Sequence, residues 1–256
     1  MADKPPDPSP SPSAAPAAPG TPQAHAWLER ARAVWDERAA RWDAISQENR
    51  VAPDRAADLV RTIDALRVNP GDRALDAGCG SGQFAIAFAE RGLQVTGVDL
   101  APAMIERARG HAAERGVAIE WRIEHLAHLS DPAAVYAAIH CRAALQFVPD
   151  AVATLREFRR VLRPGGRLYV SVPGALSPIY RESWRRHLDS DLGLNYLVPW
   201  ELEQLLIADG WTLIDGWGDY GSDISQEPTA FSPEQLSVLD LRLRQAAATT
   251  WTLIAT

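Results

Sequence analysis

The residues best suited to chemistry form a glycine-rich stretch, Asp76-Ala77-Gly78-Cys79-Gly80-Ser81-Gly82. Alternating glycines allow a sharp turn and let the backbone approach a ligand closely. A dinucleotide fingerprint requires a glycine where this chain has Gln83, and a Walker loop requires a Gly-Lys-Ser/Thr ending that this chain lacks. What remains is a carboxylate placed two residues before a G-x-G-x-G turn.

A second carboxylate, Asp99, ends the predicted strand Gln94–Asp99. An acid at the end of such a strand holds ribose hydroxyls in dinucleotide folds. The alternative role for Asp99 is to cap the helix that follows the strand. Its place directly after Gly97-Val98 favours the ligand-binding role.

Together these motifs closely resemble the class I S-adenosylmethionine (SAM)-dependent methyltransferases of the small-molecule type. Asp99 stands where that family places the acid for both ribose hydroxyls, and the run 159–166 resembles the helix and turn that lead into its fifth strand. The resemblance is good over roughly residues 35–173 and weak elsewhere. It implies methyl transfer from SAM to O, N or C of a small metabolite by in-line displacement, in which the protein mainly aligns donor and acceptor.

The resemblance also implies where SAM would bind. Gly78 and Gly80 would let the main chain reach the amino-acid end, and Asp76 would meet its ammonium through water or backbone. Leu100 and Met104 would pack on the adenine. The full set of expected cofactor contacts is Asp76, Gly78, Cys79, Gly80, Gly82, Asp99, Leu100, Met104, Glu124, His125, Leu126, Cys141 and Trp42. No metal is expected.

The chain departs from the family pattern at two places. His125 occupies the position of the usual acid that contacts the adenine amino group, with Glu124 beside it; either could serve, and Leu126 would offer its backbone. Where many small-molecule members carry a histidine pair, this chain has the run 144–147, Ala-Leu-Gln-Phe. Gln146 can orient a polar acceptor but is a poor base at neutral pH.

No catalytic base stands out, and the candidates are His187, Tyr180 and Gln146. The first two lie in residues 174–199, a segment expected to form a lid. Its aromatic side chains suit a planar or apolar acceptor, and Arg185 and Arg186 could meet a carboxylate; an amphipathic helix with a solvated basic face is the alternative. His140, within a strand, is expected to be a satisfied core residue.

Alternating strand and helix patterns predict the elements that position these residues. Repeated β-α units imply a Rossmann-like, doubly wound α/β fold with a mostly parallel seven-stranded sheet and helices on both faces. Strands are predicted at 73–77, 94–99, 118–123, 137–141, 167–172, 211–214 and 249–255, and helices from 21–22, at 53–66, 84–90, 102–114, 150–162 and 200–208, and from 232 to about 246. A type II turn is predicted at 163–166.

The composition limits the class of protein. The chain has 256 residues, a net charge of −7 and two cysteines, which argues against nucleic-acid binding by phosphate neutralisation and excludes a disulfide framework or a multi-cysteine zinc site. Residues 1–22 hold eight of the nineteen prolines and are expected to be a disordered tail. Residues 23–256 are expected to form one domain, with a helical cap at 23–67.

No signal peptide or membrane-length apolar run is visible, so a cytoplasmic protein is expected. Its expected partner is a small-molecule acceptor, with no nucleic acid and no membrane; the oligomeric state stays open. An RNA or protein methyltransferase and a non-catalytic SAM-binding protein remain the alternative functions. A dehydrogenase is disfavoured by Gln83.

Overall fold

A seven-stranded sheet forms the centre of the protein, in a computed structural model that describes residues 21–50, 53–181, 183–187, 193–220 and 240–256. The strand order is β3-β2-β1-β4-β5-β7-β6. Neighbouring strands from β1 to β5 pair in parallel, and β7 runs antiparallel to both β5 and β6. This confirms the predicted Rossmann-like, mostly parallel sheet.

The strands and helices have the following bounds. The strands are β1 (Arg73–Ala77), β2 (Gln94–Asp99), β3 (Glu120–Ile123), β4 (Tyr136–Arg142), β5 (Leu162–Pro173), β6 (Leu213–Asp219) and β7 (Thr250–Ala255). The α-helices are α1 (Pro22–Arg50), α2 (Pro53–Leu66), α3 (Gln83–Ala89), α4 (Pro102–Glu114), α5 (Ala151–Val161), α6 (Pro199–Ala208) and α8 (Leu241–Ala247). Three short 3₁₀ helices are η1 (Leu145–Phe147), η2 (Pro178–Tyr180) and η3 (Ser183–His187).

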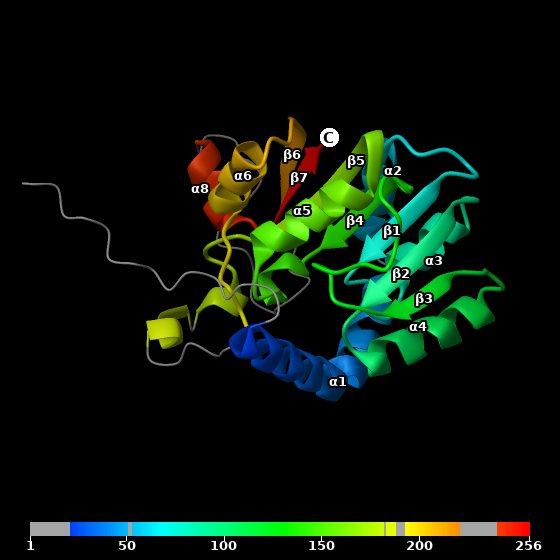
Figure 1. The fold of residues 1–256 in the computed structure, drawn as a ribbon, viewed down its shortest axis with the longest axis horizontal. Coiled ribbons are helices and arrows are strands. Elements are labelled where there is room, and N and C mark those ends of the chain that lie inside the picture. The colour runs from blue at the N-terminus through cyan, green and yellow to red at the C-terminus, as the bar shows by residue number, and fades with distance from the viewer. Residues whose placement is uncertain (1–20, 51–52, 182, 188–192, 221–239) are drawn as a thin grey trace, which may run out of the picture.

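Helices cover both faces of the sheet, with α5 in front of it and α2 behind it in Figure 1. One apolar cluster joins the sheet to Phe158 of α5 and Leu202 of α6. The opposite face packs against Leu66 of α2 and Phe88 of α3. Successive side chains of a strand point to opposite faces, so Ile139 belongs to the first cluster and the neighbouring Ala138 to the second.

The longest helix, α1, begins where the sequence predicts. The Thr21 hydroxyl accepts a hydrogen bond from the backbone N–H of Ala24 at 3.2 Å, which caps the first turn. In Figure 1 the helix runs beside α4 at one end of the sheet. Asp36 of α1 accepts the N–H of Ala103 at 3.0 Å, so α1 also caps the start of α4.

Asp43 fixes the same two helices further along their contact. Its carboxylate pairs with Arg107 at 3.2 Å and with His111 at 2.9 Å. Burial alone would raise the pKa of Asp43, but hydrogen bonds from His111 and Ser81 outweigh it and hold that pKa below its ordinary value. The carboxylate is therefore charged at neutral pH and anchors α1 to α4.

Two predicted strand boundaries are wrong. The fifth strand starts at Leu162 rather than at 167, and the predicted turn at 163–166 lies inside it, as a bulge between the pairs Tyr136–Leu162 and Ala138–Arg167. Gly165 has φ 74°, as a type II turn requires at its third residue. The sixth strand runs over 213–219 rather than 211–214, because antiparallel pairing with β7 extends to Asp219 opposite Thr250. The predicted helix start at 232 and nearly all of the predicted tail lie outside the described residues.

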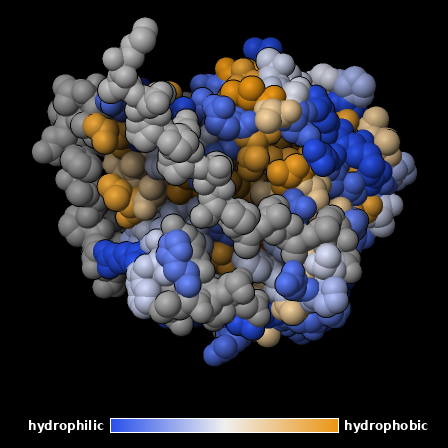
Figure 2. Space-filling view, turned by 60° about the vertical axis from the view of Figure 1, so that its left-hand side comes forward, coloured by the Kyte–Doolittle hydropathy of each residue, from blue (hydrophilic) through white to orange (hydrophobic). Residues whose placement is uncertain are grey.

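Part of the surface is apolar. Figure 2 shows groups of hydrophobic side chains among hydrophilic ones on the face that the turned view brings forward. Among described residues, Ile207 of α6 and Leu243 of α8 are large exposed apolar side chains. Scattered apolar side chains are normal on soluble proteins and point to no particular partner.

Candidate cofactor and acceptor site

A cavity of about 240 Å³ opens at the carboxyl ends of the parallel strands, beneath α1. One water molecule needs only roughly 10–15 Å³, so this cavity has room for a larger ligand. Ligands of open α/β sheets bind at this end of the strands. The cavity is lined by the glycine-rich turn, by the residues after β2, β3 and β4, and by one side of α1.

The glycine-rich turn adopts a conformation that other residues resist. Gly78, Gly80 and Gly82 have φ values of 75°, 53° and 87°, in the left-handed region that favours glycine. A Cβ atom on Gly78 would lie 2.4 Å from that of Ala144. Glycine at position 78 therefore lets the turn after β1 lie directly against the exit of β4.

Asp99 links this turn to the helix that follows β2. Its Oδ2 atom accepts the N–H of Gly80, and its Oδ1 atom accepts the N–H of Ala101, both at 2.9 Å. Ala101 is the N-cap of α4, so Asp99 does help to begin that helix. Burial raises the pKa of Asp99, opposed by the two N–H donors.

Asp76 is paired with a buried histidine. Its Oδ1 atom lies 2.8 Å from Nδ1 of His140, and its Oδ2 atom accepts the N–H of Ala85 at 3.0 Å. The His140 ring lies between Phe84 and Tyr169, with centroids 4.4 and 4.6 Å away. His140 is buried as predicted, but only half satisfied, because its Nε2 atom has no hydrogen-bond partner among described residues.

The residues after β3 differ in their hydrogen-bond partners. Glu124 accepts hydrogen bonds from the hydroxyl of Ser130 at 2.6 Å and from its N–H at 3.3 Å. His125 accepts the N–H of Ala127 on Nδ1 at 3.3 Å, whereas its Nε2 is buried without a partner in the part of the chain that the structure describes. Burial and the neighbouring His128 lower the pKa of His125 to about 4, so the ring is neutral at pH 7.

Aromatic side chains form the wall opposite the glycine turn. Trp35 of α1 makes edge contacts with Trp42 and with Phe147 of η1, with centroids 5.7 and 4.9 Å apart. Trp27 donates its indole N–H to the carbonyl of Phe147 at 2.9 Å. These contacts fix α1 against the residues that follow β4.

Arg142, at the end of β4, belongs to a half-buried charge cluster. It pairs with Asp58 of α2 and lies 3.5 Å from Asp219 of β6. Burial would lower the pKa of Arg142, but Tyr169, Asp58 and Asp219 outweigh it and raise that pKa. The guanidinium therefore stays charged at the edge of the cavity.

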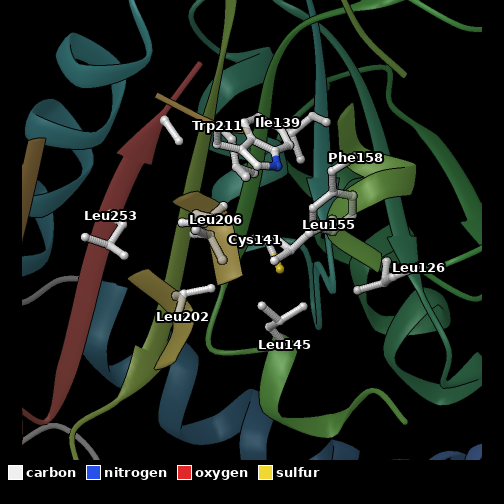
Figure 3. Packing of buried hydrophobic residues seen from close by; sticks show 14 of the residues in the cluster. Leu126, Ile139, Cys141, Leu145, Leu155, Phe158, Leu202, Leu206, Trp211 and Leu253 are labelled. Carbon is white, nitrogen blue, oxygen red and sulfur yellow. The ribbon is translucent and has the colours of Figure 1, made fainter. Parts of the chain in front are cut away.

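Most of the cofactor contacts expected from the sequence meet at this cavity. Those that line it are Asp76, Gly78, Cys79, Gly80, Asp99, Leu100, Met104, Glu124, His125, Leu126 and Trp42. Two do not. Gly82 faces Trp121 and Ala108, and the Cys141 side chain is fully buried in the apolar core beside Leu145 and Leu155 (Figure 3).

Among the catalytic candidates, only Gln146 lines the cavity. Tyr180 donates its hydroxyl to the carbonyl of Leu197 at 2.6 Å and is buried, which makes it a structural side chain. His187 is exposed at the end of η3 and is not a lining residue. Nothing is described for the side chains of Arg185 and Arg186.

The sequence did not identify several lining residues, among them His140, Arg142 and Ser177. The sequence did carry a signal for His140. Asp76 and His140 lie near the carboxyl ends of neighbouring parallel strands, and they are direct partners in the β1–β4 register. Ser177 carried no such signal, because it lies in an irregular segment after β5.

Comparison with known proteins agrees with this geometry. Residues 74–166, which include the glycine turn, Asp99 and the strands up to the bulge in β5, match the family described as methyltransferase domain. Residues 74–166 therefore form part of a methyltransferase domain. This confirms the family and the cofactor class expected from the glycine turn and Asp99.

The methyltransferase domain has curated relatives. Over 133 residues it is 37% identical to a ubiquinone biosynthesis O-methyltransferase from Xanthomonas axonopodis pv. citri (strain 306), an alignment that covers 51% of this chain and 54% of the relative. The chain thus spans about half the length of the curated relatives it matches. The similarity supports the domain assignment and leaves the acceptor to be argued from the site.

Solved structures share the fold of the methyltransferase domain. The [4+2]-cyclase SpnF is 24% identical with a TM-score of 0.58, covering 79% of both chains. A geranyl diphosphate methyltransferase in complex with SAM is 21% identical with a TM-score of 0.57, covering 78% of this chain and 84% of that one. One fold therefore serves a methyltransferase and a cyclase, so the reaction must be inferred from the site.

Within the described residues, no helix is long and apolar enough to cross a membrane. No group of three or more His, Cys, Asp or Glu side chains in these ranges is placed to hold a metal ion.

Proposed function

We propose that this chain binds SAM in the cavity beneath α1 and methylates a small-molecule acceptor there. The observation that carries the proposal is the convergence of Asp76, the left-handed glycine turn and Asp99 on one cavity. When bound, SAM supplies a methyl group already activated on a sulfonium. The residues of this chain then have to bind SAM and the acceptor, orient the two molecules and exclude water.

The lining residues fit SAM. Each oxygen of the Asp99 carboxylate holds one backbone N–H, and a carboxylate oxygen has room for a second donor. Asp99 can therefore accept the two ribose hydroxyls while it still fixes the glycine turn. Leu100 and Met104 offer apolar surface to the adenine, and Gly78 and Gly80 leave the main chain accessible to the amino-acid end.

His125, rather than Glu124, is proposed to contact the adenine. The Glu124 carboxylate is already bonded to Ser130. Since Nδ1 of His125 accepts an N–H, its neutral ring carries the proton on Nε2, the buried atom that lacks a partner among described residues. A buried donor of this kind needs an acceptor, and the ring nitrogens of adenine are acceptors.

The acceptor atom is proposed to be oxygen. The curated relatives are named O-methyltransferases, and the aromatic wall of Trp35 and Phe147 suits a planar molecule. Because methyl transfer from a sulfonium depends chiefly on alignment, Gln146 is proposed as an orienting residue rather than a base. The net charge of −7 favours a small molecule over RNA as the partner.

The two cysteines are free and buried, which supports the cytosol as the proposed compartment. Burial raises the pKa values of both thiols, that of Cys141 to about 12. Neither cysteine is therefore a reactive thiolate at neutral pH.

Calorimetric titration tests SAM binding. SAM and S-adenosylhomocysteine should bind the parent chain. Asp99→Asn should weaken binding at least tenfold, about 1.4 kcal/mol, because it removes charge-assisted acceptors. Glu106→Gln, an exposed carboxylate of α4, should change nothing. No heat with the parent chain, or binding of a nicotinamide dinucleotide instead, would overturn the proposal.

Methyl transfer needs a separate measurement. Label from methyl-labelled SAM should appear in small molecules of a cell extract, and not in its RNA or protein fractions. Binding without label in any fraction would instead indicate a non-catalytic SAM-binding protein.

A further inference from the structure

The cavity has a second end, formed by His140, Arg142, Gln146, Ser177 and Asp219, all of which line it. The strand order places β2 and β3 on one side of β1, where the proposed adenosyl contacts lie, and β4, β5, β7 and β6 on the other. We call this second side the acceptor end. If the proposed function holds, the molecule to be methylated enters here.

Three buried atoms at the acceptor end lack a hydrogen-bond partner among the described residues: His140 Nε2, Gln146 Oε1 and Ser177 Oγ. All three side chains are almost fully buried, with 1%, 2% and 4% of their surface exposed. A buried polar atom left unpaired costs roughly 1–3 kcal/mol. A ligand that forms hydrogen bonds with these unpaired atoms therefore gains binding free energy.

One of these atoms can only accept. Gln146 uses its amide Nε2 to donate to the carbonyl of Ala143 at 2.7 Å, which leaves the acceptor oxygen Oε1. His140 directs Nδ1 at the Asp76 carboxylate, so Nδ1 carries a proton, while Nε2 has no partner among the described residues. The hydroxyl of Ser177 can donate or accept. The acceptor end thus calls for a ligand with a hydrogen-bond donor.

The charges at the acceptor end also favour an uncharged ligand. Arg142 is the only arginine or lysine among the described lining residues, and Asp58 and Asp219 already neutralise it. Two carboxylates face one guanidinium, so the described lining residues hold no spare positive charge for a carboxylate or phosphate. The rings of Trp35, Phe84 and Phe147 form the apolar lining around these groups.

We infer that the acceptor is an uncharged, planar molecule that presents a hydroxyl or amine hydrogen to Gln146, and that a carboxylate on the acceptor is disfavoured. This inference deepens the proposed function and rests on it. It differs from the expectation that Arg185 and Arg186 meet a carboxylate, which concerns side chains outside the described part of the structure.

A matched pair of probes tests the inference. 4-Hydroxybenzyl alcohol and 4-hydroxybenzoate have the same ring and phenol and differ in an alcohol or a carboxylate. Each is titrated by calorimetry at pH 7.5 into the protein saturated with S-adenosylhomocysteine. We expect the alcohol to bind at least tenfold more tightly. Equal or tighter binding of the benzoate, or no binding of the alcohol, would overturn the inference.

Gln146→Leu should weaken binding of the alcohol at least fivefold and leave that of S-adenosylhomocysteine unchanged. Gln94→Leu, the same substitution at an exposed position of β2, should affect neither. An unchanged affinity for the alcohol in Gln146→Leu would contradict the assignment of Oε1. If S-adenosylhomocysteine itself does not bind the parent chain, the proposed function fails, and this inference fails with it.

Discussion

His125 combines a proposed ligand contact with an effect on stability. Its pKa in the folded chain is about 4, against an ordinary value of 6.5. Below pH 6.5 the unfolded chain therefore takes up a proton that the folded chain refuses, so stability falls as the pH drops from 6.5 towards 4. The contribution of His125 to the free energy of unfolding is fully present only above pH 6.5.

Thermal unfolding at pH 7.5 and at pH 5.0 measures this effect. The parent chain should lose stability between the two values, and His125→Gln should lose less, because glutamine does not titrate. His25→Gln, at an exposed position of α1, should keep the full loss. If His125→Gln shows the same pH dependence as the parent chain, His125 is not the neutral buried group described above.

At the scale of single elements, β2 and α4 each contain a glycine, and the two glycines differ in the space around them. A Cβ atom on Gly97 of β2 would lie 2.3 Å from the Trp121 ring, whereas one on Gly110 of α4 would have nothing within 4 Å. Gly97→Ala should cost roughly 1–3 kcal/mol through overpacking. Gly110→Ala should stabilise the helix by about 0.5–1 kcal/mol.

Urea unfolding of the two variants, fitted for the free energy of unfolding, measures both changes. The matched substitution separates the effect of local space from the general effect of adding a methyl group. A harmless Gly97→Ala would mean that the Trp121 ring does not pack on β2 as described.

The same scale shows what could be predicted from sequence. The strands β1 and β2 were predicted at their observed bounds, because an apolar run lies between turn residues on both sides. The sixth strand was misplaced, because pairing with β7, rather than local pattern, sets its ends; it contains Asp215 and Gly216, which local propensity disfavours in strands. The turn residues Pro164 and Gly165 were recognised, but they form a bulge within β5.

The candidate site divides in a similar way. The glycine turn and Asp99 are contiguous motifs with fixed spacing, so they could be recognised. His140 pairs with Asp76 across 64 positions, and the role of Ser177 depends on where an irregular segment folds back. Contacts of this kind come from tertiary structure, which is why only Gln146 of the acceptor end was predicted.

On the scale of the whole molecule, the cavity draws its lining from α1 near the start of the described chain to β7 at its end. A ligand there contacts segments that are otherwise far apart in sequence, so binding should stabilise the entire fold. A ligand at 100 times its Kd adds about 2.7 kcal/mol. For a chain of this size each kcal/mol raises the unfolding midpoint by roughly 2–4 °C.

S-adenosylhomocysteine at that excess should therefore raise the midpoint by about 5–10 °C in one cooperative transition, followed by scanning fluorimetry. NAD⁺ should raise it by less than about 1 °C, because Gln83 replaces the glycine of a dinucleotide turn. Asp99→Asn at the same ligand concentration should show a smaller shift than the parent chain. A shift with NAD⁺, or a two-step transition in which only one step moves, would contradict a single cavity that connects α1 to the sheet.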